Sequence, residues 1–281
     1  MNAFLASHLF YQFKRDNVAI LSFLILFGMI VLAFFAPVLA PHNPYDLATI
    51  DLMDAELPPL GLDGAQSHFF LGLDEQGRDM LSTMMYGLRT SLTIGIFAVA
   101  LQMLLGVVIG LLAAYYGGWL DNLLMRIADI QLSFSTLMVA IIISAIFKTA
   151  FGTAFFAAHA VSILVIIIGI SEWPQYARTI RATALAEKSK EYVEAAKVMG
   201  FSSPRIMFRH MLPNCLSPIL VISTVQIANA VMSEAALSFL GLGMPPDKPS
   251  LGSLISNGFE YISSGSWWIT LFPGIVLVLL P

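Results

Sequence analysis

The residues that could do chemistry gather in one stretch, EYVEAAKVMGFSSPRIMFRHMLP, at positions 191–213. Its first part places apolar or small side chains at i, i+3, i+4 and i+7, the spacing of one helix face, beside charged ones. These positions are Tyr192, Ala195, Ala196 and Met199. A helix of this kind binds noncovalently, along a membrane interface or in the cleft of another protein. Two alanines give little affinity for lipid but permit close approach, which favours the protein cleft.

Turn residues divide this stretch into two short helices. Gly200 stands where a helix end needs a left-handed residue. Ser203 then offers an N-cap oxygen, and Pro204 suits the first helical position. Residues 212–214, Leu-Pro-Asn, end the second helix before the next apolar segment.

Motifs for catalysis or ATP hydrolysis do not occur in the sequence. GxxxxGK[ST], HExxH and GxSxG are all missing, so we expect no catalytic residue, no metal site and no cofactor held by this chain itself. The single cysteine, Cys215, excludes an intrachain disulfide and is interpreted as a small apolar residue near a membrane boundary. The formal charge of −4 gives no indication of a nucleic-acid partner, which calls for a clustered basic surface.

The elements that must position the 191–213 stretch are long and apolar. The chain is 58% hydrophobic and 11% charged, whereas soluble domains average roughly 45–50% and about 25%. A charge at mid-bilayer costs about 2.5–3.5 kcal/mol on insertion scales, so uncharged windows are the candidate membrane spans. There are six, at about 18–40, 90–116, 130–147, 152–171, 214–239 and 262–281. The predicted fold is all-α, a polytopic transmembrane helical bundle of about six spans.

Small residues in the second span predict close helix packing. Gly106 and Gly110 have GxxxG spacing, and Gly95 and Ala98 precede them. Such residues let helix backbones approach closely where lipid gives no hydrophobic drive. The pattern indicates a packed bundle without naming the partner helix.

The two ends of the chain affect the count of spans. The first apolar run follows Lys14 and Arg15 and exceeds the roughly 7–15 residues of a signal-peptide core, and Pro41 stands directly after its end. We therefore expect an uncleaved first helix. The last run reaches Pro281 inside the helix, so either the chain is truncated or its sixth helix is short.

Basic residues predict the orientation, because they accumulate in cytoplasmic segments near the membrane. Ten of the 14 lie in the N-terminal segment, in 115–130 and in 172–213. We expect these segments in the cytoplasm and the acidic, proline-containing loop 41–87 outside. The chain then divides into 1–87, an N-terminal helix with its external loop, and 88–281, a membrane core with the cytoplasmic loop 172–213.

A few charged residues elsewhere are site candidates. Glu234 lies in the fifth span, where a carboxylate suggests a pathway function. Its place near the external end favours a structural role. Arg78 and Asp79 form either an internal ion pair in the outer loop, which we favour, or part of a docking surface for another protein. Asp129 and Glu172 fall near cytoplasmic ends and are interpreted as solvated boundary residues.

Four blocks of sequence resemble one family of transport proteins. Glu194-Ala195-Ala196, Gly200 and Leu212-Pro213 resemble the EAA loop of permease subunits of ATP-binding-cassette (ABC) importers, with Met211 in place of the usual branched aliphatic residue. Three others resemble, in the same order, the C-type permease of dipeptide/oligopeptide/nickel-class importers. They are Phe35-Ala36-Pro37 to Ala40-Pro41 with Pro44-Tyr45-Asp46; Leu71-Gly72-Leu73-Asp74 with Gly77-Arg78-Asp79, Gly87, Arg89, Ser91 and Leu92; and Glu234 with Ala235-Ala236-Leu237-Ser238-Phe239-Leu240-Gly241-Leu242-Gly243.

The resemblance implies a multi-pass permease subunit of the bacterial inner (plasma) membrane with a cytoplasmic N-terminus. It would form half of a pathway for dipeptides or oligopeptides beside a second homologous permease subunit. Two cytoplasmic ATPase subunits would bind ATP and Mg²⁺. An extracytoplasmic substrate-binding protein would deliver the cargo, with Arg78 and Asp79 as candidate contacts. Relatives also carry nickel chelates and oligosaccharides, so the substrate stays open.

In this family, residues at about 190–204 insert into a cleft of the ATPase and couple it to the permease. The resemblance implies that Glu194 makes charge-assisted hydrogen bonds to the ATPase and that Gly200 forms the turn. Ala195 and Ala196 would permit close approach. Tyr192 and Met199 are the remaining predicted coupling residues. The alternative is a secondary transporter or channel subunit that uses no ATPase. That alternative predicts broken helices in two matching halves or several buried charges in a relay, and neither pattern occurs in the sequence.

Overall fold

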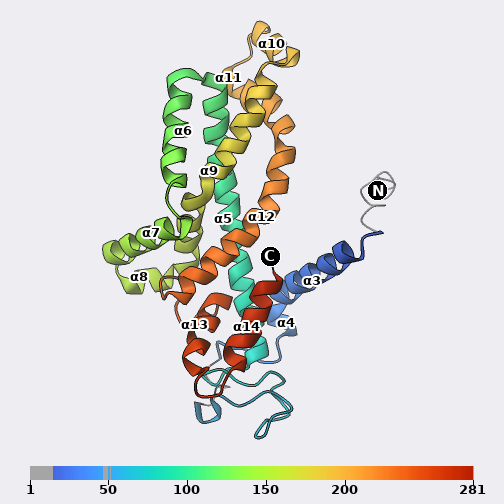
Figure 1. Cartoon of the computed structure of the whole chain (residues 1–281), viewed down its shortest axis with the longest axis vertical. Helices are drawn as coiled ribbons and strands as arrows, with labels where there is room; N and C mark the ends of the chain where they lie inside the picture. The colour runs from blue at the N-terminus through green and yellow to red at the C-terminus, as the bar shows by residue number, and fades with distance from the viewer. Residues whose placement is uncertain (1–14, 47–49, 51, 281) are drawn as a thin grey trace. The chain divides into compact units, whose positions relative to one another are not determined.

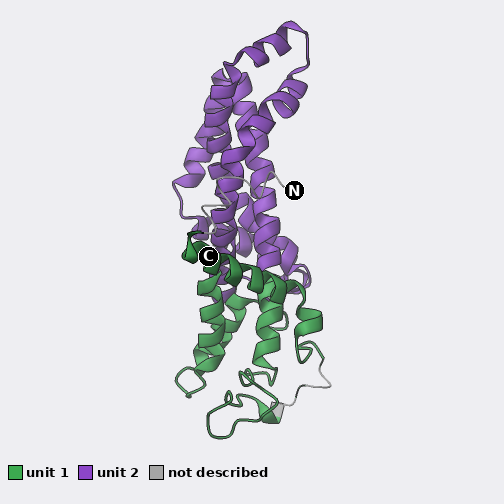
Figure 2. Cartoon of the chain, turned by 90° about the vertical axis from the view of Figure 1, so that its right-hand side faces the viewer, with its two compact units in different colours: residues 1–90, 246–281 green, residues 91–245 purple. Residues whose placement is uncertain are grey.

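The computed structural model describes residues 15–46, 50 and 52–280 (Figure 1). Within these residues the regular structure is helical, apart from one isolated antiparallel bridge between Leu73 and Asp79. The chain forms two compact units (Figure 2). The first unit comprises residues 1–90 and 246–281, and the second comprises residues 91–245.

The first unit contains short helices, one membrane-length helix and a long loop. Its elements are α3 Asn17–Phe34, α4 Ala36–Leu39, η1 Leu52–Asp54, the first residues of α5 Met80–Tyr116, α13 Leu251–Tyr261 and α14 Trp268–Leu279. Asp16 caps α3 by accepting from the N–H groups of Val18 at 3.0 Å and Ala19 at 3.2 Å. Ser250 and Ser253 form a capping box at the start of α13.

Helices α13 and α14 form a close hairpin in this unit. A Cβ atom on Gly258 would lie 2.8 Å from the carbonyl carbon of Ile269, so only glycine permits this approach. Met80 and Met84 of α5 pack with Leu254 into a small apolar core. The last helix is therefore held by packing against α13 and the start of α5.

The second unit is a bundle built around α5, α9 and α12. Its remaining helices are α6 Gly118–Leu132, α7 Thr136–Phe151, α8 Thr153–Ala158, α9 Ala160–Lys188, α10 Glu191–Val198, α11 Ser203–Arg205, the π-helix η2 Ile206–Met211 and α12 Leu212–Phe239. The glycine pattern in the second predicted span marks two of the contacts. Cβ atoms on Gly106 and Gly110 would lie within 3 Å of α9, and one on Gly95 would lie 2.7 Å from Val231 of α12.

Helices of membrane-crossing length agree with most of the predicted spans. Four are long and apolar enough to cross, at Asn17–Phe34, Met80–Tyr116, Ala160–Lys188 and Ser203–Phe239. The bent pair α6 and α7 would supply a fifth, and α14 is a shorter apolar helix. The predicted boundaries of the third and fourth spans are wrong. Helices α6 and α7 meet at 92° inside the predicted span 130–147, and α9 continues 17 residues beyond 171, to Lys188.

Polar side chains explain both differences. The Ser133 hydroxyl donates to the Asp129 carbonyl at 2.8 Å, a local bond that competes with continuing the helix, and α6 ends there. Helix α9 continues although Pro174 lacks an N–H group for the Ile170 carbonyl. The Gln131 amide of α6 donates to that carbonyl instead, at 2.6 Å. The freed acceptor is thereby satisfied, as a helix in lipid requires.

The expected helix end at residues 212–214 is a continuation instead. Helix α12 begins at Leu212, directly after the π-helical turn η2. Pro213 near its start has no N–H, and its ring would collide with the carbonyl four residues earlier in a regular α-helix. The wider turn of η2 relieves that collision. Residues 203–239 thus form one long helical segment.

Candidate functional site

Helix α10 presents one face to solvent and buries the other against its own chain. The exposed side chains include Glu191, Glu194, Ala195, Val198 and Met199, the last two at 89% and 63% exposure. We call these five residues the α10 surface. The buried ones are Val193 and Ala196. The predicted apolar stripe is therefore divided, because Ala196 supports the helix from beneath while Ala195 and Met199 face outward.

Tyr192 fixes the base of this surface. Its half-buried hydroxyl donates to the Glu187 carboxylate at 2.7 Å and accepts from the Asn214 amide at 3.1 Å. Burial, followed by the Glu187 hydrogen bond, raises the pKa of Tyr192, so the phenol remains protonated and can donate. Glu187 also pairs with Lys190 at 2.6 Å. Tyr192 thus joins α10 to the ends of α9 and α12.

Gly200 ends α10 with the predicted left-handed turn. Its φ is +76°, its N–H donates to the Lys197 carbonyl at 2.9 Å, and the Phe201 N–H donates to the Ala196 carbonyl at 3.2 Å. These two bonds define a Schellman motif. The predicted N-cap at Ser203 is wrong, because Ser202 holds that position and its side chain makes no capping hydrogen bond.

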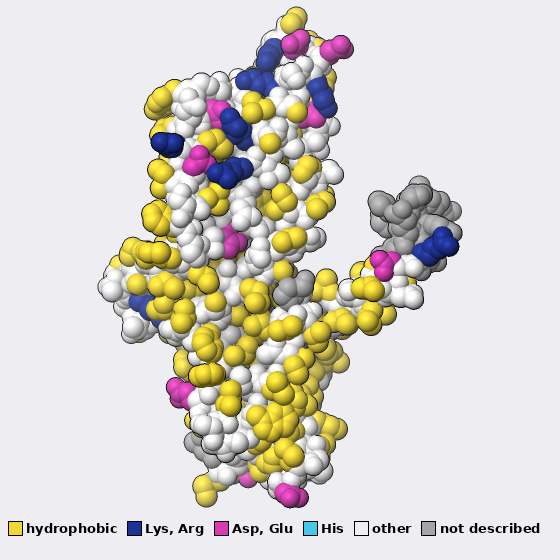
Figure 3. Space-filling model, viewed as in Figure 1, with side chains coloured by type: hydrophobic (Ala, Val, Ile, Leu, Met, Phe, Trp, Pro, Cys, Tyr) yellow, Lys and Arg dark blue, Asp and Glu magenta, His cyan; other side chains and the backbone are white. Residues whose placement is uncertain are grey.

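Charged side chains of this unit gather over α6, α9 and α10, whereas α7 and α8 are mainly hydrophobic (Figure 3). Arg181 of α9 makes a two-pronged ion pair with Asp121 of α6, at 2.5 and 2.6 Å. Arg178 pairs with Asp129, and both side chains are exposed. The charges therefore mark the end of the bundle that carries α10.

Glu172 is not at a solvated boundary, contrary to expectation. It lies inside α9 and is 4% exposed. Its carboxylate accepts from the amides of Gln102 and Gln226, each at 3.4 Å, and from the Ser233 hydroxyl at 3.3 Å. These partners come from α5 and α12. The sequence signal that could have identified this cluster is the presence of Gln102 and Gln226 in otherwise apolar spans.

Glu234 occupies a closed position on α12. It is fully buried, and the hydroxyls of Ser91 and Ser238 each donate to its carboxylate at 2.7 Å. Ser238 in turn accepts from the Met244 N–H at 3.0 Å. This geometry joins α5, α12 and the segment after α12, which supports the structural role that the sequence favours.

The outer-loop candidates Arg78 and Asp79 are also buried, but they do not pair with each other. The Arg78 guanidinium binds the Asp74 carboxylate at 2.6 Å, with side-chain exposures of 3% and 0%. Asp79 instead accepts from the Ser82 N–H at 2.9 Å. The expected Arg78–Asp79 ion pair is therefore replaced by Arg78–Asp74. Neither candidate side chain presents its charge on the surface of the loop.

Hydrogen bonds between side chains and backbone groups hold the outer loop around that ion pair. The Asp74 carboxylate also accepts from the N–H of Arg78 at 2.8 Å, and the Trp268 indole donates to the Leu73 carbonyl at 3.2 Å. A Cβ on Gly72 would lie 2.4 Å from the Leu57 carbonyl oxygen, so this position requires glycine. Residues 71–79 are thus a folded element of the first unit.

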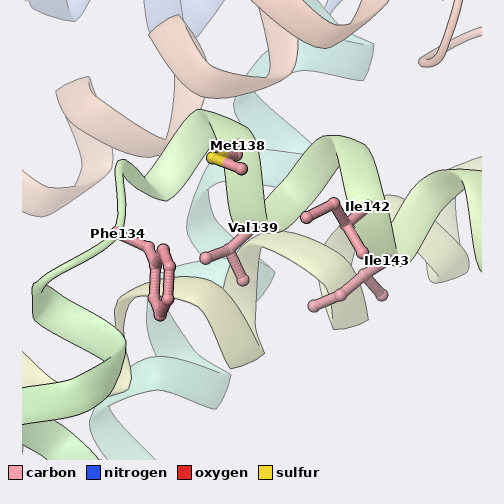
Figure 4. Close-up of a pocket in the computed structure, with 5 residues that line it drawn as sticks. All are labelled: Phe134, Met138, Val139, Ile142 and Ile143. Atoms are coloured by element: carbon pink, nitrogen blue, oxygen red, sulfur yellow. The ribbon is translucent and has the colours of Figure 1, made fainter.

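Other features offer less chemistry. A hollow of about 170 Å³ beside the α6–α7 bend is lined only by apolar side chains (Figure 4). They are Phe134, Met138, Val139, Ile142 and Ile143. In the part of the chain that the structure describes, no three His, Cys, Asp or Glu side chains are arranged to hold a metal ion. The α10 surface, by contrast, is exposed and combines charged with apolar side chains.

Solved structures support the bundle fold. The chain is similar to two structures titled inward-facing conformations of the MetNI methionine ABC transporter, in two crystal forms. The TM-scores are 0.54 and 0.53, with 18% and 19% identity. The similarity covers 71% and 72% of this chain and 92% of each matched chain. It establishes the fold.

Sequence comparisons establish the family. Residues 106–281 match the family described as "Binding-protein-dependent transport system inner membrane component", and residues 6–59 match the N-terminal transmembrane domain of oligopeptide transport permease C. Similar proteins include the dipeptide transport system permease proteins DppC of Haemophilus influenzae and Escherichia coli K12. They are 34% and 36% identical, over 95% and 96% of this chain and 86% and 85% of theirs.

A third relative is the di/tripeptide transport system permease protein DppC of Pseudomonas aeruginosa, 35% identical over 95% of this chain and 84% of its own length. Matches of this identity and extent, together with the apolar spans, leave one assignment. The chain belongs to the binding-protein-dependent inner membrane components and is an integral inner-membrane permease subunit of an ABC importer.

Proposed function

We propose that this permease subunit forms half of a pathway for short peptides. We also propose that its α10 surface binds a partner ATPase subunit and couples ATP hydrolysis there to movement of the permease. The single observation that carries the proposal is the α10 surface itself. The side chains of the α10 surface, and Lys197 beside them, are exposed on and directly after a short helix that Tyr192 and the Gly200 turn hold in place. Hydrogen bonds from Tyr192 to Glu187 and Asn214 connect this exposed helix to α9 and α12.

The α10 surface suggests a division of roles within the predicted coupling residues. Glu194 would accept charge-assisted hydrogen bonds from the ATPase, and Ala195 would permit close approach. Val198 and Met199 would add apolar contact area. Ala196 and Gly200 would act indirectly, by seating and ending the helix. A helix so anchored to α9 and α12 would transmit movement of the ATPase to two helices of the bundle.

The proposed assembly follows from what this chain lacks in its sequence. It has no ATP-binding motif, so two cytoplasmic ATPase subunits would bind ATP and Mg²⁺. A second homologous permease would complete the pathway, and an extracytoplasmic binding protein would deliver the cargo. The names of the relatives support dipeptides and tripeptides as that cargo.

The proposed orientation places the N-terminus and α10 in the cytoplasm and residues 41–87 outside. The supporting observation is the charge distribution: Arg126 lies on α6 and Arg178, Arg181 and Lys188 lie on α9, and charged side chains gather over α6, α9 and α10 (Figure 3). Lys14 belongs to the same prediction but lies outside the described residues.

Reversing the charge of Glu194 tests the coupling role. We expect the Glu194→Lys permease to fold and insert normally, because the side chain is exposed, and its complex to lose most cargo-stimulated ATP hydrolysis and uptake. The measurement is ATPase activity and peptide uptake of the purified complex in liposomes, with and without loaded binding protein. Glu260→Lys, at an exposed carboxylate on α13, is the matched control and should behave as wild type.

Two results would contradict the proposal. Full stimulation and full uptake in Glu194→Lys would remove the α10 surface from the coupling path. Peptide transport by this chain in liposomes without ATP or ATPase subunits would support the alternative, a secondary transporter or channel.

A further inference from the structure

The cluster around Glu172 lies between three helices of the second unit. Glu172 is on α9, Gln102 on α5, and Gln226 and Ser233 on α12. Each of the three partners donates a hydrogen bond to the Glu172 carboxylate. Within the described residues, no lysine or arginine makes an ion pair with it. Among the described residues, the groups that hydrogen-bond to this carboxyl group are therefore all neutral.

A second observation in the same cluster points to a missing donor. Gln102 is fully buried, and its side-chain carbonyl oxygen has no hydrogen-bond partner. Its amide nitrogen meanwhile donates to Glu172 and to the Ile168 carbonyl, each at 3.4 Å. Buried polar atoms are seldom left unpaired. The cluster thus combines a buried carboxyl group that has no cationic partner with an unused acceptor, a pair that suits a cationic hydrogen-bond donor.

The cluster reaches the surface of the bundle along one side of α12. Gln226, Asn229 and Ser233 are spaced i, i+3 and i+7, so they share a helix face. Their exposure rises from buried Gln226 through half-buried Ser233 to exposed Asn229, whose side-chain amide donates to the Gln226 side-chain oxygen at 2.8 Å. Polar side chains in membrane helices face the bundle interior or a water-filled cavity rather than lipid. This side of α12 is therefore the polar face through which the cluster reaches the surface of the bundle.

We propose that Glu172, with Gln102 and Gln226, is a subsite for the primary ammonium group of the cargo. This inference rests on the proposed peptide function and adds the group that the permease itself recognises. A primary ammonium carries three N–H donors, the number of neutral donors that Glu172 now accepts. Movement of α12 relative to α9 would exchange the bonds from Gln226 and Ser233 for bonds from the cargo. Ser233 and Asn229 form the approach to the subsite.

Direct binding to the purified transporter complex, without binding protein, tests this subsite. The probes are labelled dialanine and its N-acetyl derivative, which lacks the ammonium. We expect wild type to prefer dialanine by about tenfold or more, the usual difference between charge-assisted and neutral hydrogen bonds. Glu172→Gln should abolish most of that preference, whereas Glu172→Asp should retain it because the charge remains.

Glu234→Gln is the matched control, because Glu234 is also a buried carboxylate bonded by hydroxyl groups in the same unit. It should keep the wild-type preference. An unchanged preference for dialanine in Glu172→Gln would overturn the subsite. It would show that the Glu172 carboxylate does not bind the ammonium group of the cargo. Wild-type binding that is equal for the two probes, or undetectable for both, would overturn it as well. ATP-driven uptake of dialanine by wild type with binding protein tests the proposed function separately.

Discussion

The outer loop and the α10 surface use the same kinds of charged residue in opposite ways. In the outer loop, Asp74 and Arg78 are buried, bind each other and organise the surrounding backbone. On α10, Glu191 and Glu194 are exposed, and among the described residues neither takes part in an ion pair. Charge is thus used for folding in the first region and is available to a partner in the second. The comparison predicts stability defects from the loop and coupling defects from α10.

The largest expected effect is that of Asp74→Ala. Removing this carboxylate takes the 2.6 Å partner from the buried Arg78 guanidinium and leaves Glu75, at 4.0 Å, as a more distant one. Breaking a buried ion pair costs about 3–5 kcal/mol in other proteins. We expect little folded complex and a strongly lowered unfolding temperature, measured by thermal denaturation of the purified complex. Asp63→Ala, at an exposed position in the same loop, should be neutral. Equal stability of the two variants would show that the outer loop is not held by its buried charges.

An intermediate effect is expected from Gly200→Val. Valine strains the left-handed turn at φ +76° by about 1–2 kcal/mol, although nothing within 4 Å obstructs its Cβ. Gly241 offers a matched control, because it ends α12 with φ +72° and the same pair of hydrogen bonds. Both variants should lose similar stability, but only Gly200→Val should lower cargo-stimulated ATP hydrolysis per folded complex. A similar loss in Gly241→Val would mean that coupling follows general stability rather than the α10 surface.

The smallest effect concerns the pH dependence of the outer loop. Burial raises the pKa of Glu75, and the neighbouring Asp74 carboxylate adds to this shift. The folded loop therefore binds a proton more tightly than the unfolded chain does. This contribution to stability is present in acid and is lost as the pH rises through the raised pKa. Glu75→Gln should remove that part of the pH dependence.

The measurement for Glu75→Gln is the unfolding temperature of the complex across a pH series, compared with wild type. The Asn257 amide donates to Glu75 at 2.9 Å, and glutamine keeps an acceptor for it. Asp63→Asn, which changes an exposed carboxylate, should leave the pH profile as in wild type. Parallel profiles for Glu75→Gln and wild type would contradict the prediction. They would show that Glu75 does not change its protonation state over the pH range in which the protein is folded.

Several features followed from the sequence because their causes are local. Charges are costly in hydrocarbon, so uncharged windows located α3, α5 and α12. Gly200 was predictable because a left-handed helix end favours glycine. The GxxxG spacing predicted close packing but did not identify the partner, which is α9. The predicted end of the fourth span was wrong because a distant side chain replaced a backbone hydrogen bond. Pro174 has no N–H for the Ile170 carbonyl, and the Gln131 amide donates to that carbonyl instead.

By itself, the sequence determined the class of protein, its apolar spans and the position of the amphipathic helix. Only the tertiary structure decided which charges are available to partners. It paired Arg78 with Asp74 rather than with its neighbour Asp79, and it turned Ala196 inward. It also joined Glu172 to amides 54 and 70 positions away in the chain. Spacing along a helix reports which residues share a face, but burial depends on the helix that packs against that face.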